Sequence, residues 1–398
     1  MKILVVAPTP FFSDRGTHIR ILEEALALEK RGHKIVIATY HIGADLPKHL
    51  DTGIDIRRIR RLLFWYKKLE AGPDWQKIIL DLMLIRKTFF LARTWKPDII
   101  HGHLHEGALI GWIVEKALFW RKMMLVADFH GSLTKEMVSH SYLRTALLQG
   151  FFEMIEHRID SLGDAAVTSS WDNAADINKV RLNDPAQVLL DGTRLSLFEK
   201  LPDVSLIRTA YHIPKDKIII TYTGALIPNK GIQLLLDAIP LVCEKHREAH
   251  FVIAGFPVDQ ITGYVERDIF KTRATIISPL SYFALPQILK MSDIGVDPKA
   301  SSTRQASGKT LQYMGAGLPI ACFDTRNNRE YLDDGGTYAR AMTPEGLADA
   351  IGELIDSPPL RAAKGAINRR RAELFSWEKS AEQLENLYKK IIIEKRRV

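Results

Sequence analysis

Lys230 is the clearest candidate for phosphate chemistry, because it stands between a predicted strand and a predicted helix. Residues 218–223 are apolar and β-branched, and the run 223–231, which contains Gly224 and Lys230, follows directly. A lysine at the carboxyl end of a buried strand can neutralise a phosphate as a compact charge. A solvated lysine at a helix start would have the same local sequence, so this pattern leaves both interpretations open.

A stretch of small and basic residues at 301–310 is a second candidate anion site. Arg304 and several small residues precede Gly308 and Lys309, where we expect a helix to begin. The free backbone N–H groups and the dipole of a helix start attract anions, and the two basic side chains add positive charge. An ordinary solvated loop is the alternative, but the density of small and basic residues favours a phosphate cradle.

The loop after the first predicted strand, residues 8–20 with Arg15 and Gly16, lies where parallel sheets place their phosphate loops. It contains neither the G-x-G-x-x-G pattern of dinucleotide sites nor a Walker lysine pattern. The sequence therefore gives little support to a nicotinamide role, and we expect no bound cofactor.

Several histidines follow predicted strands. His101, His103 and His105 alternate after one strand, and His130 ends another. Alternating histidines can bind a metal, but no cysteine accompanies these and Glu106 is the one nearby carboxylate, so we expect no metal. An imidazole at position 130 can bond substrate hydroxyls, and a packed structural histidine is equally consistent with the sequence.

Basic and aromatic residues are interleaved between residues 57 and 96, where eleven lysines and arginines stand against three acids. This combination suits the headgroup region of an anionic membrane. The alternative is a solvated basic helix whose apolar face joins the core, as part of the helix from residue 74 must. The residues expected at a membrane or acceptor surface are Arg57, Arg58, Arg60, Arg61, Trp65, Lys67 and Lys68.

Two series of alternating strands and helices position these residues, which predicts an α/β fold with two doubly wound parallel sheets. Ligands of such sheets bind beyond the carboxyl ends of the strands. We expect an N-terminal domain over residues 1–195, completed by a helix at 376–398, and a C-terminal domain over 205–375. Strands are expected at residues 2–8, 34–40, 54–59, 98–101, 123–128, 165–169 and 187–190, then at 218–223, 250–255, 275–278, 294–297 and 319–323. Helices are expected at residues 17–31, 74–94, 231–244, 285–291, from 309, and at 376–396.

The composition limits the class of protein. Of the 398 residues, 46% are hydrophobic and 26% charged, which are globular values. Two cysteines argue against a disulfide framework, and neither a signal peptide nor a spanning segment is evident, so we expect a cytoplasmic location. The net charge of +8 suits phosphates, nucleic acid or an anionic membrane, but no nucleic-acid motif is present.

Together these pieces resemble glycosyltransferase family 4, the retaining GT-B enzymes, across nearly the whole chain. No single piece is specific, but their shared order is. After the glycine loop, the pieces are Gly32-His33, residues 97–101, residues 127–131, residues 168–170, Asp191-Gly192, residues 223–231, residues 253–255, residues 313–319 and residues 375–378.

The resemblance implies a GT-B fold, in which two Rossmann-like domains face a central cleft, and a nucleotide-sugar donor held mainly by the C-terminal half. Lys230 matches the family lysine that contacts the donor diphosphate, and Gly16 matches the glycine loop that closes on it. His130 matches the histidine that reaches the transferred sugar. The family needs no metal, because a lysine and a helix start offset the charge of the leaving diphosphate.

The resemblance also implies a nucleotide site in the C-terminal half. The segment 307–312 matches the helix start that holds the nucleotide, which places Gly308 and Lys309 at the diphosphate. The tail from Trp377 matches the helix that crosses back to the N-terminal domain. The nucleotide itself is then expected beside Gly224, Gly255, Leu280 and Gln312.

Three positions depart from the family pattern. Ala225 stands where the family usually has an arginine, and Arg304 and Gln312 stand where it has two glutamates. Gln312 can still accept a hydrogen bond but brings no charge. Lys309 resembles the helix-start lysine of one subgroup and can replace the missing arginine charge. These departures leave the donor open.

The resemblance thus implies a retaining transfer of a sugar from a nucleoside-diphosphate donor, with His130, Lys230 and Arg304 expected at the reacting centre. The expected acceptor is a glycan or a lipid-linked molecule, at the cytoplasmic face of a membrane to which the protein is peripherally bound. The alternatives are a non-catalytic protein that binds a nucleotide sugar and assists a partner, and a nucleotide-sugar epimerase. Few cleft carboxylates beyond Glu106 and Asp128 are available for the epimerase reaction.

Overall fold

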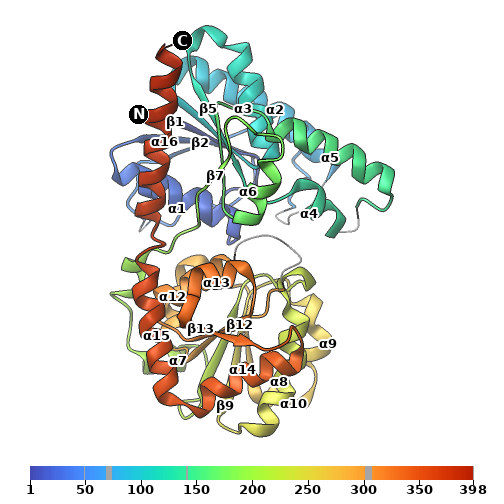
Figure 1. Cartoon of the computed structure of the whole chain (residues 1–398), viewed down its shortest axis with the longest axis vertical. Helices are drawn as coiled ribbons and strands as arrows, with labels where there is room; N and C mark the ends of the chain where they lie inside the picture. The colour runs from blue at the N-terminus through green and yellow to red at the C-terminus, as the bar shows by residue number, and fades with distance from the viewer. Residues whose placement is uncertain (49, 69–73, 140–141, 301–306, 398) are drawn as a thin grey trace. The chain divides into compact units, whose positions relative to one another are not determined.

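The computed structural model describes residues 1–48, 50–68, 74–139, 142–300 and 307–397. The chain forms two compact units (Figure 1). The first combines Met1–Leu190 with Trp377–Val398, and the second is Asp191–Ser376. The first unit is therefore discontinuous in sequence.

The first unit is built on a parallel sheet with the strand order β3-β2-β1-β4-β5-β6-β7. Its strands carry continuous apolar runs, as strands buried on both faces do. The strands are β1 (Lys2–Ala7), β2 (Lys34–Thr39), β3 (Asp55–Arg58), β4 (Ile99–His103), β5 (Met124–Phe129), β6 (Ala165–Thr168) and β7 (Gln187–Val188).

Helices cover both faces of this sheet. On one face, Leu4 and Val6 of β1 share a core with Leu80 and Leu84 of α2. On the other, α16 lies against α1, as the red and blue helices of Figure 1 show. The helices are α1 (Gly16–Lys30), α2 (Trp75–Trp95), α3 (Leu104–Ala117), α4 (Leu133–Ser139), α5 (Ala146–Asp160), α6 (Trp171–Ile177) and α16 (Trp377–Arg397).

The second unit repeats the same winding. Its parallel sheet has the order β10-β9-β8-β11-β12-β13, with β8 (Ile218–Thr223), β9 (Ala249–Ala254), β10 (Ala274–Ile277), β11 (Ile294–Asp297), β12 (Ile320–Phe323) and β13 (Gly336–Ala339). Counted in chain order, both sheets begin 3-2-1-4-5-6. In each, the order reverses beside the first strand, between β1 and β4 and between β8 and β11, and ligands of open α/β sheets bind at such switch points.

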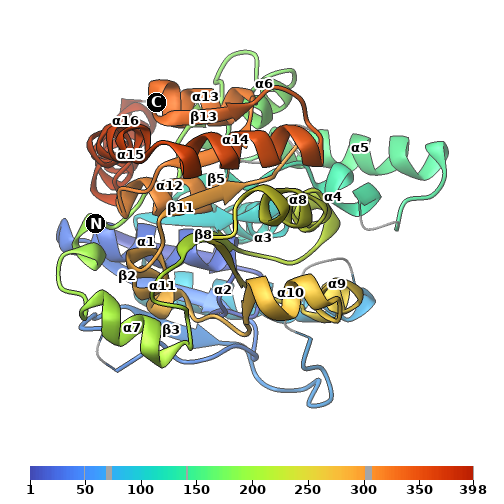
Figure 2. The ribbon, with the colours of Figure 1, turned by 90° about the horizontal axis from the view of Figure 1, so that it is seen from below.

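The helices of the second unit pack around one large apolar core. Leu235 and Ile239 of α8 meet Leu347 and Ile351 of α14 in this core, and Figure 2 shows the two helices side by side. The helices are α7 (Val204–Ala210), α8 (Ile232–Lys245), α9 (Thr262–Val265), α10 (Asp268–Arg273), α11 (Leu285–Lys290), α12 (Gly308–Gly315), α13 (Arg326–Leu332), α14 (Pro344–Asp356) and α15 (Pro358–Ala372).

Several helix starts follow sequence rules. Ser170, Thr325, Thr343 and Ser357 precede α6, α13, α14 and α15, and each hydroxyl accepts a backbone N–H of the first turn. Proline follows the cap in α14 and α15, where its missing N–H costs nothing.

The predicted fold class, α/β with two doubly wound parallel sheets, is confirmed. The helix predicted at residues 17–31 corresponds to α1, so the first loop, given as residues 8–20, ends earlier than Arg20. Helix α1 begins at Gly16, so Arg20 lies inside the helix, where it is buried and donates hydrogen bonds to Asp128. A contact with a residue so distant in sequence cannot be predicted from local spacing.

Candidate active site

Three lysines gather at the switch point of the second unit. Lys230 ends the 3₁₀ turn η3 (Pro228–Lys230) that follows β8, Lys299 lies two residues beyond β11, and Lys309 is the second residue of α12. Lys299 is buried, and the Lys309 side chain is 11% exposed. The topology of the sheet therefore brings cations from three separate segments to one place.

Asp297 is the close carboxylate partner of Lys309. Its Oδ1 lies 3.3 Å from the Lys309 ammonium, and its Oδ2 accepts a hydrogen bond from Thr310 at 3.2 Å. The ammonium also lies 4.2 Å from the centroid of the Tyr222 ring, which is a cation–π contact. These contacts hold the Lys309 side chain against the end of the sheet.

The cations of this cluster repel one another. Burial comes first, and the charges of Lys230 and Lys309 add to it, so that the pKa of Lys299 is well below its usual range. Asp297 and Asp191 act in the opposite direction but do not restore it. An anion bound here would relieve the repulsion, so the cluster is suited to a diphosphate.

Glycines let the surrounding loops approach closely. A Cβ on Gly255 would lie 1.8 Å from the carbonyl oxygen of Gly224, and one on Gly231 would lie 1.9 Å from that of Pro298. Gly231 also has a φ of 77°, which glycine adopts without strain. These contacts pack the loop that ends in Lys230 against the segment that carries Lys299.

The remaining residues predicted for the nucleotide have varied surroundings. Gly308 begins α12, where a Cβ would lie 3.7 Å from Asp191 Oδ2. Gln312 is buried, and its side-chain oxygen accepts a hydrogen bond from Thr193 at 3.3 Å. Leu280 packs on a small core cluster of the second unit. Arg304 lies outside the described residues.

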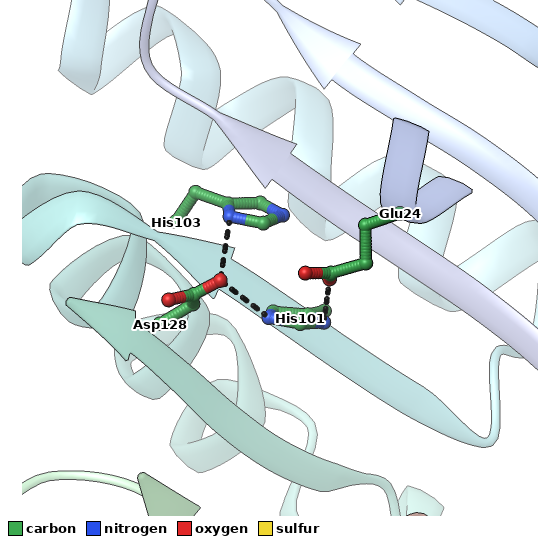
Figure 3. Close-up of side chains that lie close together, drawn as sticks. All are labelled: Glu24, His101, His103 and Asp128. Carbon is green, nitrogen blue, oxygen red and sulfur yellow. Dashed lines mark ion pairs between the residues drawn. The ribbon is translucent and has the colours of Figure 1, made fainter. Parts of the chain in front are cut away.

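In the first unit, a buried polar cluster lies between the sheet and helices α1 and α16. Figure 3 shows Glu24 of α1, His101 and His103 of β4, and Asp128 of β5 close together, with Asp128 paired to both histidines and Glu24 paired to His101. Each of these side chains is almost fully shielded from solvent. His130 joins the cluster from the residue after β5, with its Nε2 3.1 Å from His103 Nδ1.

Arg20 fixes the charge of Asp128. The Arg20 guanidinium donates to both carboxylate oxygens of Asp128, at 3.0 and 3.3 Å, and to the Leu189 carbonyl at 3.0 Å. Burial alone would raise the pKa of Asp128, but Arg20, His130 and the neighbouring histidines hold it well below its usual range. Asp128 is therefore an anion.

Glu24 and Tyr388 both lie beside His101 of this cluster. The Tyr388 hydroxyl of α16 lies 2.5 Å from His101 Nδ1, and Glu24 Oε1 lies 3.4 Å from the same nitrogen. Burial raises the pKa of Glu24, against the lowering effect of His101 and Arg20. The C-terminal helix thus contributes a hydrogen-bonding group to a cluster formed by the N-terminal sheet.

The geometry of this cluster does not favour a metal ion. The ligand atoms of Glu24, His101, His103 and Asp128 lie within 4.8 Å of one another, which is close enough for coordination. However, the four side chains are already paired with one another, Glu24 with His101 and Asp128 with both histidines. The Arg20 guanidinium also already neutralises Asp128.

His105 belongs to a different group, although it alternates with His101 and His103 in sequence. It lies in α3, and its Nε2 is 3.2 Å from Asp160 and 3.7 Å from Glu156. Burial lowers the pKa of His105, but the two carboxylates more than offset this and raise it. Glu156 also accepts the backbone N–H groups of Leu133 and Thr134, so this group ties α3, α4 and α5 together.

The loop after β1 leads to Gly16, the first residue of α1. Gly16 is exposed, and no atom lies within 4 Å of the position where its Cβ would be. His18 stabilises the loop, because its Nδ1 accepts the Ser13 backbone N–H at 3.0 Å. The start of α1 therefore has open space beside it.

The segment 57–68 has many exposed basic and apolar side chains. Arg57, Arg60, Arg61 and Lys67 are exposed, and Trp65 is 55% exposed. Arg58 and Lys68 are half-buried. Arg58 donates hydrogen bonds to the Ile42 and Ala44 carbonyls, and the Lys68 ammonium lies 3.8 Å from the Asp74 carboxylate. Among the helices of the described residues, none has the length and apolarity needed to cross a bilayer.

A pocket of about 480 Å³ lies beside this basic segment, at the carboxyl ends of β1 and β2. Its lining combines apolar, acidic and basic groups, so it can hold a polar ligand with an anionic group. The lining residues are Phe12, Ser13, Asp14, His41, Ile42, Gly43, Ala44, Arg61 and Lys67.

Sequence reasoning missed Lys299, Arg20 and Glu24 as members of these sites. Lys299 could have been found, because it follows a strand of the second sheet as closely as His130 follows β5. Arg20 and Glu24 have no such signal, since each looks like an ordinary charged residue of an amphipathic helix. It also missed an apolar surface on α5, where Leu147, Leu148, Phe151 and Met154 are exposed.

Two family profiles match the chain, one on each unit. The profile described as Glycosyltransferase Family 4 matches residues 15–193, and the profile described as Glycosyl transferases group 1 matches residues 217–357. The first runs from the residue before α1 to beyond β7, and the second covers the β8–α14 region that carries all three lysines.

Individual proteins are similar over half or nearly all of the chain. Spore coat protein SA of Bacillus subtilis is 30% identical over 188 residues, which are 44% of this chain and 49% of that protein. The D-inositol 3-phosphate glycosyltransferase of Mycolicibacterium paratuberculosis is 24% identical over 403 residues, covering 95% of this chain and 86% of that protein.

A solved structure has the same fold. It is that of HepE from Anabaena in complex with UDP-glucose, with a TM-score of 0.75 and 16% identity over 98% of this chain and 100% of that one. The two profiles, the relative matched over 95% of the chain and the shared fold agree, and the chain belongs to glycosyltransferase family 4, whose members have the GT-B fold.

Proposed function

We propose that this glycosyltransferase moves a sugar from a nucleoside-diphosphate donor to a glycan or lipid-linked acceptor, with retention of the anomeric configuration. The donor diphosphate binds at the lysine cluster of the second unit. The acceptor binds to the first unit, at the cytoplasmic face of a membrane, and His130 contacts the transferred sugar.

The observation that carries this proposal is the cluster of Lys230, Lys299 and Lys309. Three lysines lie together at the switch point of a parallel sheet, beside the start of α12; Lys299 is buried, the Lys309 side chain is 11% exposed and Lys230 is half-buried. A diphosphate would neutralise the excess charge, and the free N–H groups of the helix start would bind its oxygens. As a leaving group, the same diphosphate would be stabilised by the charges that bind it.

The names of similar proteins suggest which donor to test first. The structure of HepE from Anabaena has been solved in complex with UDP-glucose, and the mycobacterial relative is named a D-inositol 3-phosphate glycosyltransferase. Neither protein is similar enough to fix the donor of this chain. Uridine nucleotides are therefore the first donors to test, followed by guanosine and adenosine nucleotides.

The environment of Asp128 supports a front-face mechanism. A double displacement needs a carboxylate free to attack the sugar, but Asp128 is buried and its two oxygens accept hydrogen bonds from Arg20. In the front-face reaction, the bond from the sugar C1 to the leaving phosphate breaks while the acceptor oxygen bonds to C1 on the same face. A phosphate oxygen takes the acceptor proton, so no enzyme carboxylate is needed as a base.

The basic segment and its pocket support an anionic acceptor near a membrane. Arg61 and Lys67 line the pocket, while Trp65 and Phe64 are exposed on the same segment. Basic side chains attract anionic lipid headgroups, and aromatic rings settle at the interface. A phosphate-bearing acceptor in a bilayer would satisfy both features.

The test is turnover of UDP-, GDP- and ADP-sugars by the purified protein, with and without anionic vesicles and candidate acceptors. Lys230→Ala should abolish release of the nucleoside diphosphate from the one donor that is used. Lys290→Ala, which removes an exposed lysine of α11, is the matched control and should have no effect. The product anomer, read by NMR, tests retention.

Three results would contradict the proposal. An inverted product would exclude the front-face reaction. Donor binding by calorimetry without turnover, in the presence of every acceptor, would leave only a nucleotide-sugar-binding role. Absence of both binding and turnover would remove the donor assignment of the lysine cluster.

A further inference from the structure

His103 lies between a buried carboxylate and His130. Its Nδ1 is 3.3 Å from Asp128 Oδ2 and 3.1 Å from His130 Nε2. Asp128 Oδ2 is itself 3.7 Å from His130 Nε2, too far for a good hydrogen bond. His103 is therefore the group through which Asp128 can act on His130.

We propose that His103 and Asp128 are positioning residues that hold His130 in one orientation and place its proton on Nδ1. This inference rests on the proposed function, in which His130 contacts the transferred sugar. It concerns two residues that do not themselves touch the substrate.

The first step of the argument is the charge of Asp128. Arg20 donates to both of its oxygens, and the pair lies in the interior, where Asp128 is fully shielded from solvent. A carboxylate with such a partner stays ionised and accepts hydrogen bonds only. Of the facing nitrogens of His103 and His130, His103 Nδ1 is the nearer to Asp128 Oδ2, at 3.3 Å against 3.7 Å, and is thus favoured as its donor.

The second step is the proton on His103. Burial and the neighbouring His101 lower the pKa of His103 to about 3, so the ring is neutral and carries one proton. If His103 Nδ1 were unprotonated, its lone pair would face the Asp128 carboxylate oxygen at 3.3 Å, and the two would repel each other. The proton therefore belongs on Nδ1, where it is shared between Asp128 and His130.

The third step follows at His130. Because His103 Nδ1–H donates, His130 Nε2 is the acceptor in the uncharged form of the ring, and that form carries its one proton on Nδ1. His130 is a hydrogen-bond donor through that nitrogen. It can bond an oxygen of the sugar, and it has no free nitrogen to act as the base that removes the acceptor proton.

The ring orientations are fixed by packing. The His103 ring stacks on His101 at 4.4 Å with an interplanar angle of 10°, and it meets the His130 ring edge-on at 87°. His101 is held in turn by Tyr388 at 2.5 Å. A displacement of His103 would therefore be resisted from both sides.

Two matched variants separate the donor role of His103 from its bulk. His103→Asn places an amide N–H near the position of Nδ1, whereas His103→Leu has similar volume and no donor. In His103→Leu, His130 Nε2 would face only the Asp128 carboxylate, so its proton should move to Nε2. In His103→Asn the proton should stay on Nδ1.

The direct measurement is ¹⁵N NMR of the histidine side chains in the full chain, with the His130 signals assigned by their loss in His130→Gln. We expect a protonated Nδ1 in the wild type and in His103→Asn, and a protonated Nε2 in His103→Leu. With the donor identified, kcat of His103→Leu should fall by about tenfold to a hundredfold while KM for the donor changes little. His103→Asn should recover most of kcat.

A wild-type His130 protonated on Nε2 would overturn the inference, and so would a proton that stays on Nδ1 in His103→Leu. These outcomes are independent of turnover. If His130→Gln is as active as the wild type, the proposed role of His130 fails, while the NMR result still decides whether His103 sets its tautomer. If His103→Leu does not fold, the wild type and His103→Asn decide the question.

Discussion

The ammonium of Lys309 lies 3.3 Å from Oδ1 of Asp297, and the carboxylate is 1% exposed. Neither atom has a partner with hydrogen-bond geometry among the residues that the structure describes. The two groups therefore attract each other as charges while the donors of the ammonium remain available. This arrangement orients a lysine whose bonding capacity is left for a ligand.

Lys309→Met should weaken nucleoside-diphosphate binding by tenfold or more, which is about 1.4 kcal/mol. It should also destabilise the fold by about 3–5 kcal/mol, because Asp297 is left buried without its cation. The double change Lys309→Met with Asp297→Asn removes both charges and should recover stability without recovering affinity. Calorimetry with UDP, GDP and ADP and thermal unfolding measure the two effects; recovery of affinity in the double variant would contradict the ligand role.

Gly231→Ala should lower both stability and donor binding. The new Cβ would lie 1.9 Å from the Pro298 carbonyl oxygen, and the φ of 77° disfavours alanine. The loop that carries Lys230 would have to shift away from Lys299. Gly263→Ala is the control, because no atom lies within 4 Å of its Cβ position in α9. Equal unfolding midpoints for the two variants would argue against the close approach.

Asp81 should make the first unit less stable as the pH rises. Burial and the charge of Glu106 raise the pKa of Asp81 from 3.8 to about 7, although its hydrogen bond with Tyr40 acts in the opposite direction. The folded state therefore binds this proton more tightly than the unfolded state. The contribution of the Asp81 carboxyl to the free energy of unfolding is fully present below pH 3.8 and is lost as the pH rises through about 7.

Asp81→Asn tests this dependence, because an amide cannot lose the proton but can still accept from Tyr40. The free energy of unfolding of the variant, relative to that of the wild type, should increase between pH 4 and pH 8 by about 3 kcal/mol, as measured by denaturant unfolding. Asp51→Asn, at an exposed position, should follow the wild type. A constant difference between Asp81→Asn and the wild type would mean that Asp81 ionises normally in the fold.

Binding to anionic vesicles should depend on the basic segment 57–68. Removing two exposed charges by Arg60→Ala with Lys67→Ala should cost about 2 kcal/mol, or roughly thirtyfold in vesicle affinity, and the loss should shrink at high salt. Arg340→Ala with Lys290→Ala removes two exposed charges of the second unit and controls for net charge. Vesicle sedimentation measures both, and an equal loss in the control would indicate nonspecific attraction.

The alternation of strands and helices was predictable because the spacing of apolar residues differs between the two kinds of element. β8 and β11 fall at the predicted residues, and α2 lies one residue from its predicted position. The polar cluster was not predictable, because Arg20 and Asp128 are 108 positions apart and meet only through the topology. Lys299 was overlooked for another reason, since a lysine in the interior contradicts the usual burial pattern of charged residues.

The return of α16 to the first unit sets the order in which the protein can be completed during synthesis. Residues 1–190 leave the ribosome first, yet their sheet lacks Tyr388 and the rest of α16 until the whole second unit has been made. The polar cluster of Glu24, His101 and Asp128 thus spends most of translation without the helix that later lies over it. An isolated first unit would have to be produced with residues 191–376 deleted, so that residue 377 follows residue 190 directly. The nascent chain has to tolerate an unfinished domain while its neighbour folds.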